Sequence, residues 1–382
     1  MKILHIANGY VFSKLYKAFV EQLSQEVDKQ TVFAPIRKAN QSGINKAEKN
    51  NIRIIYSLIV SKIIYRFLFH QKIKKTLNKL QQECLVQEFD LIHAHTLFSD
   101  GAVAYKLKKQ HNIPYIVTIR NTDINDFYKY LIHLRNYGLN ILLESEKIVF
   151  ISEAYKERLF NNYIPEKNRK GLLQKSIIIP NGIDDFWLKN INNSKKELGN
   201  TIKLLFTGEI RKNKNLLGII DAILLINNKD IEFTIVGEGL NDETNYLLKL
   251  KEKIKDYNSI KLFAVVQKEE LKDYYRNADI FIMPSFTETF GLVYAEALSQ
   301  GLPLIYTKGE GFDKVFPEKH IGVSVNPNNP KDIANAINYI IDNYNNIQKK
   351  CAIASKKFSW ETIAEVYLQH YSAIKDKVSD AN

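Results

Sequence analysis

Two glutamates, Glu288 and Glu296, stand eight residues apart in the segment FIMPSFTETFGLVYAEALSQGLPLI at 281–305. This segment predicts a buried strand that ends at Met283 and a helix that begins near Gly291. A helix start presents unpaired N–H groups and the positive end of the helix dipole, which together attract an anion. An anion held there, with carboxylates on both sides to accept hydroxyl hydrogen bonds, fits a ligand made of a sugar, a diphosphate and a ribose.

The residues around these glutamates resemble a known family. Glu288 and Glu296 form the E-x7-E pattern of retaining glycosyltransferases with the GT-B fold, and their context PS-x3-ETFG-x3-EA is similar to glycosyltransferase family 4. Two glutamates at this spacing are common by chance, so the context carries the resemblance: Asp279, Pro284-Ser285, Glu288-Thr289-Phe290-Gly291, Glu296-Ala297 and Gly301-Leu302-Pro303. The resemblance covers most of the chain and is strongest over 176–306.

The resemblance implies a donor site in the second half of the chain. It assigns the hydroxyls of the donor sugar to Glu288 and the ribose hydroxyls to Glu296. The donor pyrophosphate is assigned to the backbone of Thr289, Phe290, Gly291 and Leu292 together with Lys214 and Arg211. Gly208 and Gly237 complete the donor-binding set, because VGEG at 236–239 is similar to the family's turn from strand to helix.

The stretch LLFTGEIRKNKNLLGIIDAI at 204–223 is similar to the first donor-binding loop of the family. Lys214 matches the family lysine, whereas Glu209 stands where the family arginine commonly follows the glycine, so Arg211 is the candidate for that role. Two cations near a departing diphosphate would stabilise the negative charge that develops as the glycosidic bond breaks. The alternative is an ordinary solvated basic loop.

Segments in the first half resemble the acceptor side of the family. Gly9 follows the first predicted strand, where the family carries a glycine-rich loop, and is assigned to acceptor binding. His95 ends the strand in HAHTLFSDG and is a catalytic candidate, with a purely structural histidine as the alternative. In TIRNTDI, Asp123 matches the family aspartate, which could hydrogen-bond sugar or acceptor, and Arg120 indicates an acidic acceptor group such as phosphate or carboxylate.

We expect neither a metal nor another cofactor, since the nucleotide sugar is a substrate and the family generally works without a divalent metal. The residues agree with this expectation. No Asp-x-Asp pair lies in a predicted strand-end loop, and we find no close cluster of histidines with cysteines.

The elements that must position these residues alternate along the chain. Buried strands are predicted at 2–7, 31–34, 90–95, 115–119, 147–152, 176–179, 202–206, 231–236, 260–263, 279–283, 303–306 and 323–325. Helices are predicted at 14–28, 57–82, 98–111, 153–162, 214–228, 241–256, 268–277, 291–300, 331–347 and from Trp360 to about Lys377. Strands separated by helices favour parallel sheets with helices on both faces, and ligands bind beyond the carboxyl ends of such strands.

The length of 382 residues and an Asn-rich stretch at 189–201 indicate two domains. We expect the GT-B form of the α/β class, with two Rossmann-like doubly wound domains facing across a cleft. The first would span 1–188, with the C-terminal helix 360–382 packing back on it, and would bind the acceptor. The second would span 189–359 and would bind the nucleotide sugar.

Composition favours a globular protein of the cytoplasm. Apolar residues make up 45% and charged residues 25%, and no run approaches the roughly 18 apolar residues of a membrane span. We see no secretory signal at the start. The two cysteines, Cys84 and Cys351, exclude a disulfide framework and are expected to be free thiols.

All of the formal net charge of +12 belongs to the first half. Residues 1–189 hold 29 basic and 17 acidic side chains, and the rest of the chain holds 25 of each (54 − 29 and 42 − 17). This asymmetry favours an anionic partner such as a membrane surface, although the lysines could serve only solubility. The segment 57–80 combines large apolar side chains with Lys62, Arg66 and several lysines, which suits either a helix lying on anionic lipid or an ordinary core-facing helix with a basic outer face.

The sequence therefore predicts a retaining glycosyltransferase of the hexosyltransferase type. It would move a sugar from a nucleotide-diphosphate donor, UDP-linked rather than GDP-linked, to a glycan or lipid-linked acceptor in cell-surface polysaccharide biosynthesis. Peripheral association with the inner face of the plasma membrane would fit the net positive charge of residues 1–189. Two alternatives remain: a sugar-nucleotide epimerase on the same fold, and a nucleic-acid-binding protein, for which recognition modules and a basic–aromatic stripe are absent.

Overall fold

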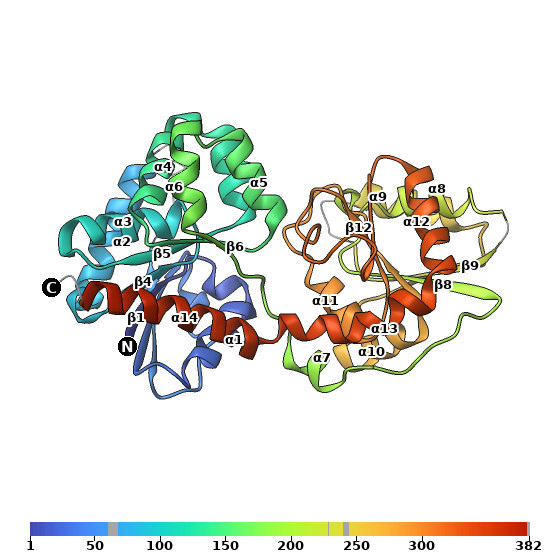
Figure 1. Ribbon diagram of the computed structural model, residues 1–382, viewed down its shortest axis with the longest axis horizontal. Helices are drawn as coiled ribbons and strands as arrows, with labels where there is room; N and C mark the ends of the chain where they lie inside the picture. The colour runs from blue at the N-terminus through green and yellow to red at the C-terminus, as the bar shows by residue number, and fades with distance from the viewer. Residues whose placement is uncertain (60–67, 228, 240–243, 380–382) are drawn as a thin grey trace. The chain divides into compact units, whose positions relative to one another are not determined.

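The computed structural model describes residues 1–59, 68–227, 229–239 and 244–379, and the chain divides into two compact units (Figure 1). The first unit contains residues 1–151, 155–182 and the C-terminal segment from 360. The second contains 152–154 and 183–359. The main crossover thus follows Gly182, whereas the sequence analysis placed the second domain from 189 onward.

The first unit is built on a seven-stranded parallel sheet in the order β3-β2-β1-β4-β5-β6-β7. Its strands are β1 (Lys2–Ile6), β2 (Lys29–Ile36), β3 (Ile52–Leu58), β4 (Leu91–Ala94), β5 (Tyr115–Ile119), β6 (Lys147–Phe150) and β7 (Ser176–Ile178). The central strands β1, β4 and β5 are almost continuous buried runs, as expected for a sheet covered on both faces.

Among the described residues, the two faces of this sheet are covered by the helices α1 (Lys14–Leu23), α2 (Phe69–Glu83), α3 (Ser99–His111), α4 (Arg135–Glu144), α5 (Glu153–Asn162), α6 (Glu166–Gln174) and α14 (Trp360–Ser379). One hydrophobic core joins the sheet to α2, α3 and α4. A second hydrophobic core, on the other face of the sheet, joins the sheet to α1 and α14, which lie side by side (Figure 1). The ring of Phe19 on α1 packs 4.7 Å from that of Tyr367, so α14 closes the N-terminal core although it comes last in the chain.

The second unit is a six-stranded parallel sheet in the order β10-β9-β8-β11-β12-β13. Its strands are β8 (Thr201–Thr207), β9 (Asp230–Val236), β10 (Ile260–Phe263), β11 (Ile280–Ile282), β12 (Leu304–Thr307) and β13 (Gly322–Val325). Its helices are α7 (Asp185–Lys189), α8 (Leu216–Ile223), α9 (Thr244–Ile254), α10 (Lys268–Asn277), α11 (Leu292–Ser299), α12 (Pro330–Asp342) and α13 (Tyr344–Ser355). Helices α8, α9 and α12 gather on one side of this sheet, and α7, α10, α11 and α13 on the other (Figure 1).

The prediction of two Rossmann-like domains is confirmed, but some elements differ from the sequence analysis. The predicted helix 57–82 is wrong at its start, because 52–58 forms the edge strand β3 and α2 begins only at Phe69. Residues 60–67 of the proposed membrane-binding segment lie outside the described residues. The predicted helix 331–347 is two helices, since α12 ends at Asp342 and α13 begins at Tyr344. Among the described residues, none of the helices combines the length and apolar character that a membrane crossing requires.

Candidate functional site

Glu288 and Lys214 meet in the second unit, where the loops after β11 and β8 come together. The two strands are neighbours in the sheet, so their carboxyl ends bring these loops to the same edge. Lys214 Nζ lies 2.7 Å from Glu288 Oε2, and both side chains are largely buried, with 12% and 14% of their surfaces exposed. The second carboxylate oxygen accepts a hydrogen bond from the N–H of Thr289 at 3.0 Å. A cation and a carboxylate are thus held together in a partly dry loop, where each would act strongly on a polar ligand.

Asn213 and Asn215 fix the Lys214 loop against the Glu288 loop. Asn213 Oδ1 accepts from the N–H and the hydroxyl of Thr287, and its Nδ2 donates to the carbonyl of the same residue at 2.8 Å. Asn215 adopts a left-handed backbone conformation and donates to the carbonyls of Pro284 and Pro327. The position of Lys214 is therefore set by two asparagines that the sequence analysis missed.

A third loop, after β12, supports the backbone of Glu288. Glu310 Oε2 accepts from the N–H of Glu288 at 2.9 Å, and the N–H of Gly311 donates to the carbonyl of Glu288, also at 2.9 Å. A Cβ atom at Gly311 would lie 2.1 Å from the carbonyl oxygen of Thr289, so no other residue fits without moving the loop. Both backbone groups of Glu288, its N–H and its carbonyl, are thus hydrogen-bonded to this loop.

The helix α11 begins directly after this loop, as the sequence predicted. Gly291 precedes the helix with φ of +77°, a conformation that glycine adopts readily, and a Cβ atom there would lie 2.5 Å from the ring of Tyr294. Phe290 is buried against Phe312 and Phe358, while Leu292 is the first helical residue. The first turn of a helix leaves its N–H groups without carbonyl partners inside the helix, which makes this position suited to an anion.

Glu296 lies one further turn along α11 in a pocket of aromatic side chains. Its Oε2 accepts from the hydroxyl of Tyr275 at 3.3 Å, and that hydroxyl also shares a hydrogen bond of 2.9 Å with Thr207. The indole of Trp187 packs edge-on against Tyr275. Burial raises the pKa of Glu296 to about 7, and hydrogen bonds from Tyr275 and Trp187 oppose this shift only in part. The carboxylate is thus oriented but poorly solvated, which leaves it receptive to hydroxyl donors.

The remaining predicted donor residues lie at the ends of β8 and β9. Gly208 and Gly237 are in close contact, since a Cβ atom at Gly237 would lie 1.9 Å from the carbonyl oxygen of Gly208. Arg211 Nε lies 3.4 Å from Glu209 Oε2, and its side chain is 38% exposed. Lys214 therefore contacts Glu288. Arg211 instead pairs with Glu209, the residue that stands where the family arginine commonly follows the glycine.

In the first unit, His95 belongs to a buried group of three histidines. His5 on β1 faces His93 across the strand pair, and the rings of His93 and His95 stack 4.0 Å apart. This cluster was not predicted from the sequence, because His5 is far from the other two histidines in the chain and only the pairing of β1 with β4 joins them. The ring nitrogens of the three lie within 4.8 Å of one another, a spacing compatible with a metal ion.

Hydrogen bonds account for this histidine cluster without a ligand. His5 bonds through Nε2 to Gln30 Oε1 at 3.0 Å and through Nδ1 to His95 Nε2 at 3.1 Å. His93 bonds to the hydroxyls of Tyr371 and Thr118. Burial lowers the pKa of all three imidazoles, that of His5 to about 4, so the cluster is neutral at physiological pH. This arrangement favours a structural role for His95, and its catalytic role stays a prediction.

The other predicted residues of the first unit lie near the carboxyl ends of β1, β4 and β5. Asp123 is 1% exposed and its carboxylate accepts N–H groups from Leu97, Phe98 and Arg120, so it holds the loops after β4 and β5 together. Burial raises its pKa to about 6. Arg120 donates to Asn181 at 2.9 Å, and Gly9 leaves room for the hydroxyl of Tyr16, which would lie 2.9 Å from a Cβ atom. Direct contact of these residues with an acceptor stays a prediction.

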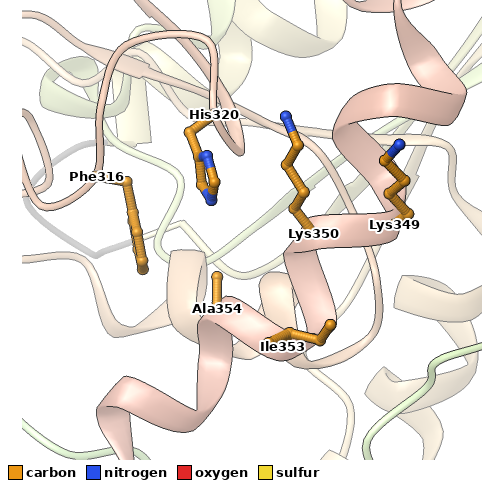
Figure 2. A pocket seen from close by; sticks show the side chains of 6 residues that line it. All are labelled: Phe316, His320, Lys349, Lys350, Ile353 and Ala354. Carbon is orange, nitrogen blue, oxygen red and sulfur yellow. The ribbon is translucent and has the colours of Figure 1, made fainter.

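A surface pocket of about 430 Å³ also lies in the second unit, between α13 and the loop before β13. Figure 2 shows Lys349, Lys350, Ile353 and Ala354 on α13 and, across from them, Phe316 and His320. The last two rings are nearly parallel, with centroids 6.2 Å apart. None of the residues that the sequence analysis singled out lines this pocket.

Two family models match the chain and together span most of it. The model described as "Glycosyltransferase Family 4" matches residues 17–185, and the model described as "Glycosyl transferases group 1" matches residues 189–358.

Individual proteins are similar over comparable lengths. An uncharacterised glycosyltransferase of Methanocaldococcus jannaschii is 28% identical, with 75% of this chain and 76% of that protein covered. The alpha-monoglucosyldiacylglycerol synthase of Acholeplasma laidlawii is 25% identical over 98% of this chain and 96% of its own. Among solved structures, Anabaena HepE in complex with UDP is 18% identical and covers 98% of this chain and 100% of its own with a TM-score of 0.72. At this identity the structural similarity establishes the fold.

Proposed function

The chain belongs to glycosyltransferase family 4 and is a glycosyltransferase of the GT-B fold, and from this premise we propose that it is a retaining enzyme that uses a UDP-sugar. The observation that carries the proposal is the Lys214–Glu288 pair at the start of α11, with Glu296 on the same helix. The lysine and the start of the helix suit the phosphates of a sugar nucleotide, and the two carboxylates suit its hydroxyls. The choice of UDP is supported by HepE, which was solved with UDP and with UDP-glucose.

Each part of the donor would meet one of these groups. The ribose hydroxyls would donate to Glu296, and the hydroxyls of the transferred sugar to Glu288. The pyrophosphate would lie against the backbone of residues 289–292 and take up the charge of Lys214, with Arg211 nearby. We expect no divalent metal to be required, because these cations and the helix start would supply the positive charge.

The reaction would be a substitution at the anomeric carbon with retained configuration. The bond from this carbon to the β-phosphate oxygen breaks as a bond to the acceptor oxygen forms on the same face of the sugar. The departing phosphate takes the acceptor proton, so UDP leaves protonated and no side-chain base is needed. Lys214 would stabilise the charge on the leaving group in the transition state, which is where it accelerates the reaction.

We propose that the first unit binds the acceptor, near Gly9, His95, Arg120 and Asp123, and that the acceptor is a glycan or a lipid-linked glycan of cell-surface polysaccharide synthesis. The lipid product named for the Acholeplasma relative supports a lipid-linked acceptor. A cytoplasmic location with reversible binding to the inner face of the plasma membrane would match the net charge of +12, which lies entirely within residues 1–189.

A donor panel tests the proposed function. We expect UDP-sugars to raise the melting temperature of the protein more than GDP-sugars do, because a ligand that binds only the folded state stabilises it. Incubation of the preferred donor without acceptor should give only slow hydrolysis. An epimerised sugar nucleotide in that reaction would support the epimerase instead. With acceptor, an inverted anomeric configuration, seen by NMR of the product, would exclude the retaining mechanism.

The raised pKa of Glu296 predicts a pH dependence of donor binding. The fraction of ionised Glu296 rises from about 0.1 at pH 6 to about 0.9 at pH 8 for a pKa of about 7. Since the ionised carboxylate is the better hydroxyl acceptor, UDP-glucose should bind up to about tenfold more tightly at pH 8. The affinity is measured by isothermal titration calorimetry at the two pH values. UDP-glucose is a suitable ligand, because both of its phosphates are esterified and do not titrate in this range. Glu296→Gln should abolish the trend, and equal affinity of the wild type at both pH values would contradict the assignment.

A further inference from the structure

Three basic residues lie along the carboxyl edge of the sheet in the first unit. Arg37 follows β2 and Arg120 follows β5, while Lys72 comes from the first turn of α2. The strands β2, β1, β4 and β5 are consecutive neighbours, so the residues that follow them share one edge of the sheet. Within the described ranges, none of the three cations forms an ion pair with a carboxylate.

Lys72 is half-buried, whereas Arg37 is exposed. Its Nζ lies 3.4 Å from the hydroxyl of Ser99, which begins α3 directly after the loop that follows β4. Burial lowers the pKa of Lys72. Asp100 would oppose this shift only when it is ionised, and the positive charge of Arg37 adds to the shift. A half-buried ammonium group near another cation, with a hydroxyl as its hydrogen-bond partner, lacks a counterion of full charge.

Asp100 does not supply that counterion. It is 1% exposed, one of its carboxylate oxygens accepts from the N–H of Asn8 at 3.1 Å, and the other has no hydrogen-bond partner among the described residues. Burial raises the pKa of Asp100 to about 8, so the group is largely protonated at neutral pH. In its protonated form Asp100 carries no negative charge, so it does not neutralise the cations at this edge.

The two arginines hold their guanidinium groups at the same edge through contacts with rings. Arg37 lies over the ring of Phe12, with 5.7 Å to the centroid, and Arg120 lies over that of Tyr16 at 5.6 Å. Arg120 also donates to the carbonyl of His95 at 3.3 Å, next to the loop that leads to Ser99. Stacking on a ring leaves guanidinium N–H groups available to a ligand.

We propose that this edge binds a phosphate group of the acceptor, with Lys72 as the principal contact and Arg37 and Arg120 as further cations. Phosphate fits better than a carboxylate because it carries up to two charges and three terminal oxygens, enough to satisfy several donors at once. The inference rests on the proposed function, in which the first unit binds the acceptor. It narrows the acceptor to a phosphorylated sugar or a lipid with a phosphate headgroup.

The test measures phosphate binding while the donor site is filled. Full-length wild type, Lys72→Met and the control Lys74→Met, an exposed lysine on the same helix, are saturated with UDP. Each is then titrated with glucose 6-phosphate, glucose and glucuronate, and is mixed with phosphatidylcholine vesicles with or without phosphatidic acid. UDP affinity and melting temperature are measured for every variant.

We expect the wild type to bind glucose 6-phosphate, or the phosphatidic acid vesicles, and Lys72→Met to bind that probe about 10- to 100-fold more weakly. Lys74→Met should match the wild type, and UDP affinity should be the same in all three proteins. Loss of binding only to the sugar phosphate identifies a soluble acceptor, and loss only with vesicles identifies a lipid headgroup.

Equal affinity of Lys72→Met and wild type for every phosphate probe would overturn the inference, as would tighter binding of glucuronate than of glucose 6-phosphate. Failure of the proposed function would look different. In that case UDP would not bind the wild type, whatever Lys72→Met did to the phosphate probes.

Discussion

Replacing Glu288 with glutamine, or Lys214 with methionine, is expected to reduce the rate of sugar transfer by about 100- to 1,000-fold. Both groups would act on the bond that breaks: Lys214 on the departing diphosphate and Glu288 on the hydroxyls of the sugar. Because the two groups form an ion pair at 2.7 Å, removal of one leaves the other largely buried without its partner. The turnover number with saturating UDP-sugar and acceptor measures the loss.

The double variant Lys214→Met/Glu288→Gln separates catalysis from structural support. It removes both charges, so neither is left largely buried without its partner, and it should melt close to the wild type while remaining inactive. Lys212→Met, an exposed lysine in the same loop, is the matched control and should retain activity. Near-normal turnover in either single variant would remove the catalytic assignment.

Gly311→Ala is expected to reduce transfer by at least about tenfold without unfolding the first unit. The added methyl group would lie 2.1 Å from the carbonyl oxygen of Thr289, so the backbone on both sides of that contact must move. Because Gly311 also donates to the carbonyl of Glu288, the shift passes to the Glu288 carboxylate. Displacements of about 1 Å near the chemistry can cost as much as 100-fold in rate.

Gly309→Ala provides the control for this prediction. Gly309 lies in the same loop with φ of +76°, so alanine is strained there too, but its Cβ atom would meet nothing within 4 Å. The strain should lower stability by about 1–2 kcal/mol and leave turnover near the wild-type value. Equal activity of Gly311→Ala and Gly309→Ala would show that the contact with Thr289 does not position Glu288.

The sequence predicted most of both sheets because buried parallel strands are short apolar runs separated by helices. It missed β3, a mostly half-buried edge strand, because the apolar run that follows Leu58 favoured a longer helix. The boundary between α12 and α13 was missed for a related reason, since Asn343 interrupts the helix without a glycine or proline to mark the break.

The candidate site was predictable where one segment carries the whole pattern. Glu288, Gly291 and Glu296 lie on one strand–loop–helix unit, so their spacing and context indicated an anion site with two carboxylates. Glu310 and Gly311 were not predictable, because only the adjacency of β11 and β12 brings them to Glu288. The histidine cluster was missed in the same way, as it depends on the register of His5 with His93.

The position of UDP in a crystal structure of the complex tests the central claim most directly. We predict that the phosphates lie at the start of α11 within hydrogen-bond reach of Lys214, and that the ribose hydroxyls contact Glu296. UDP bound in the second unit away from Gly291, or bound to the first unit, would contradict it.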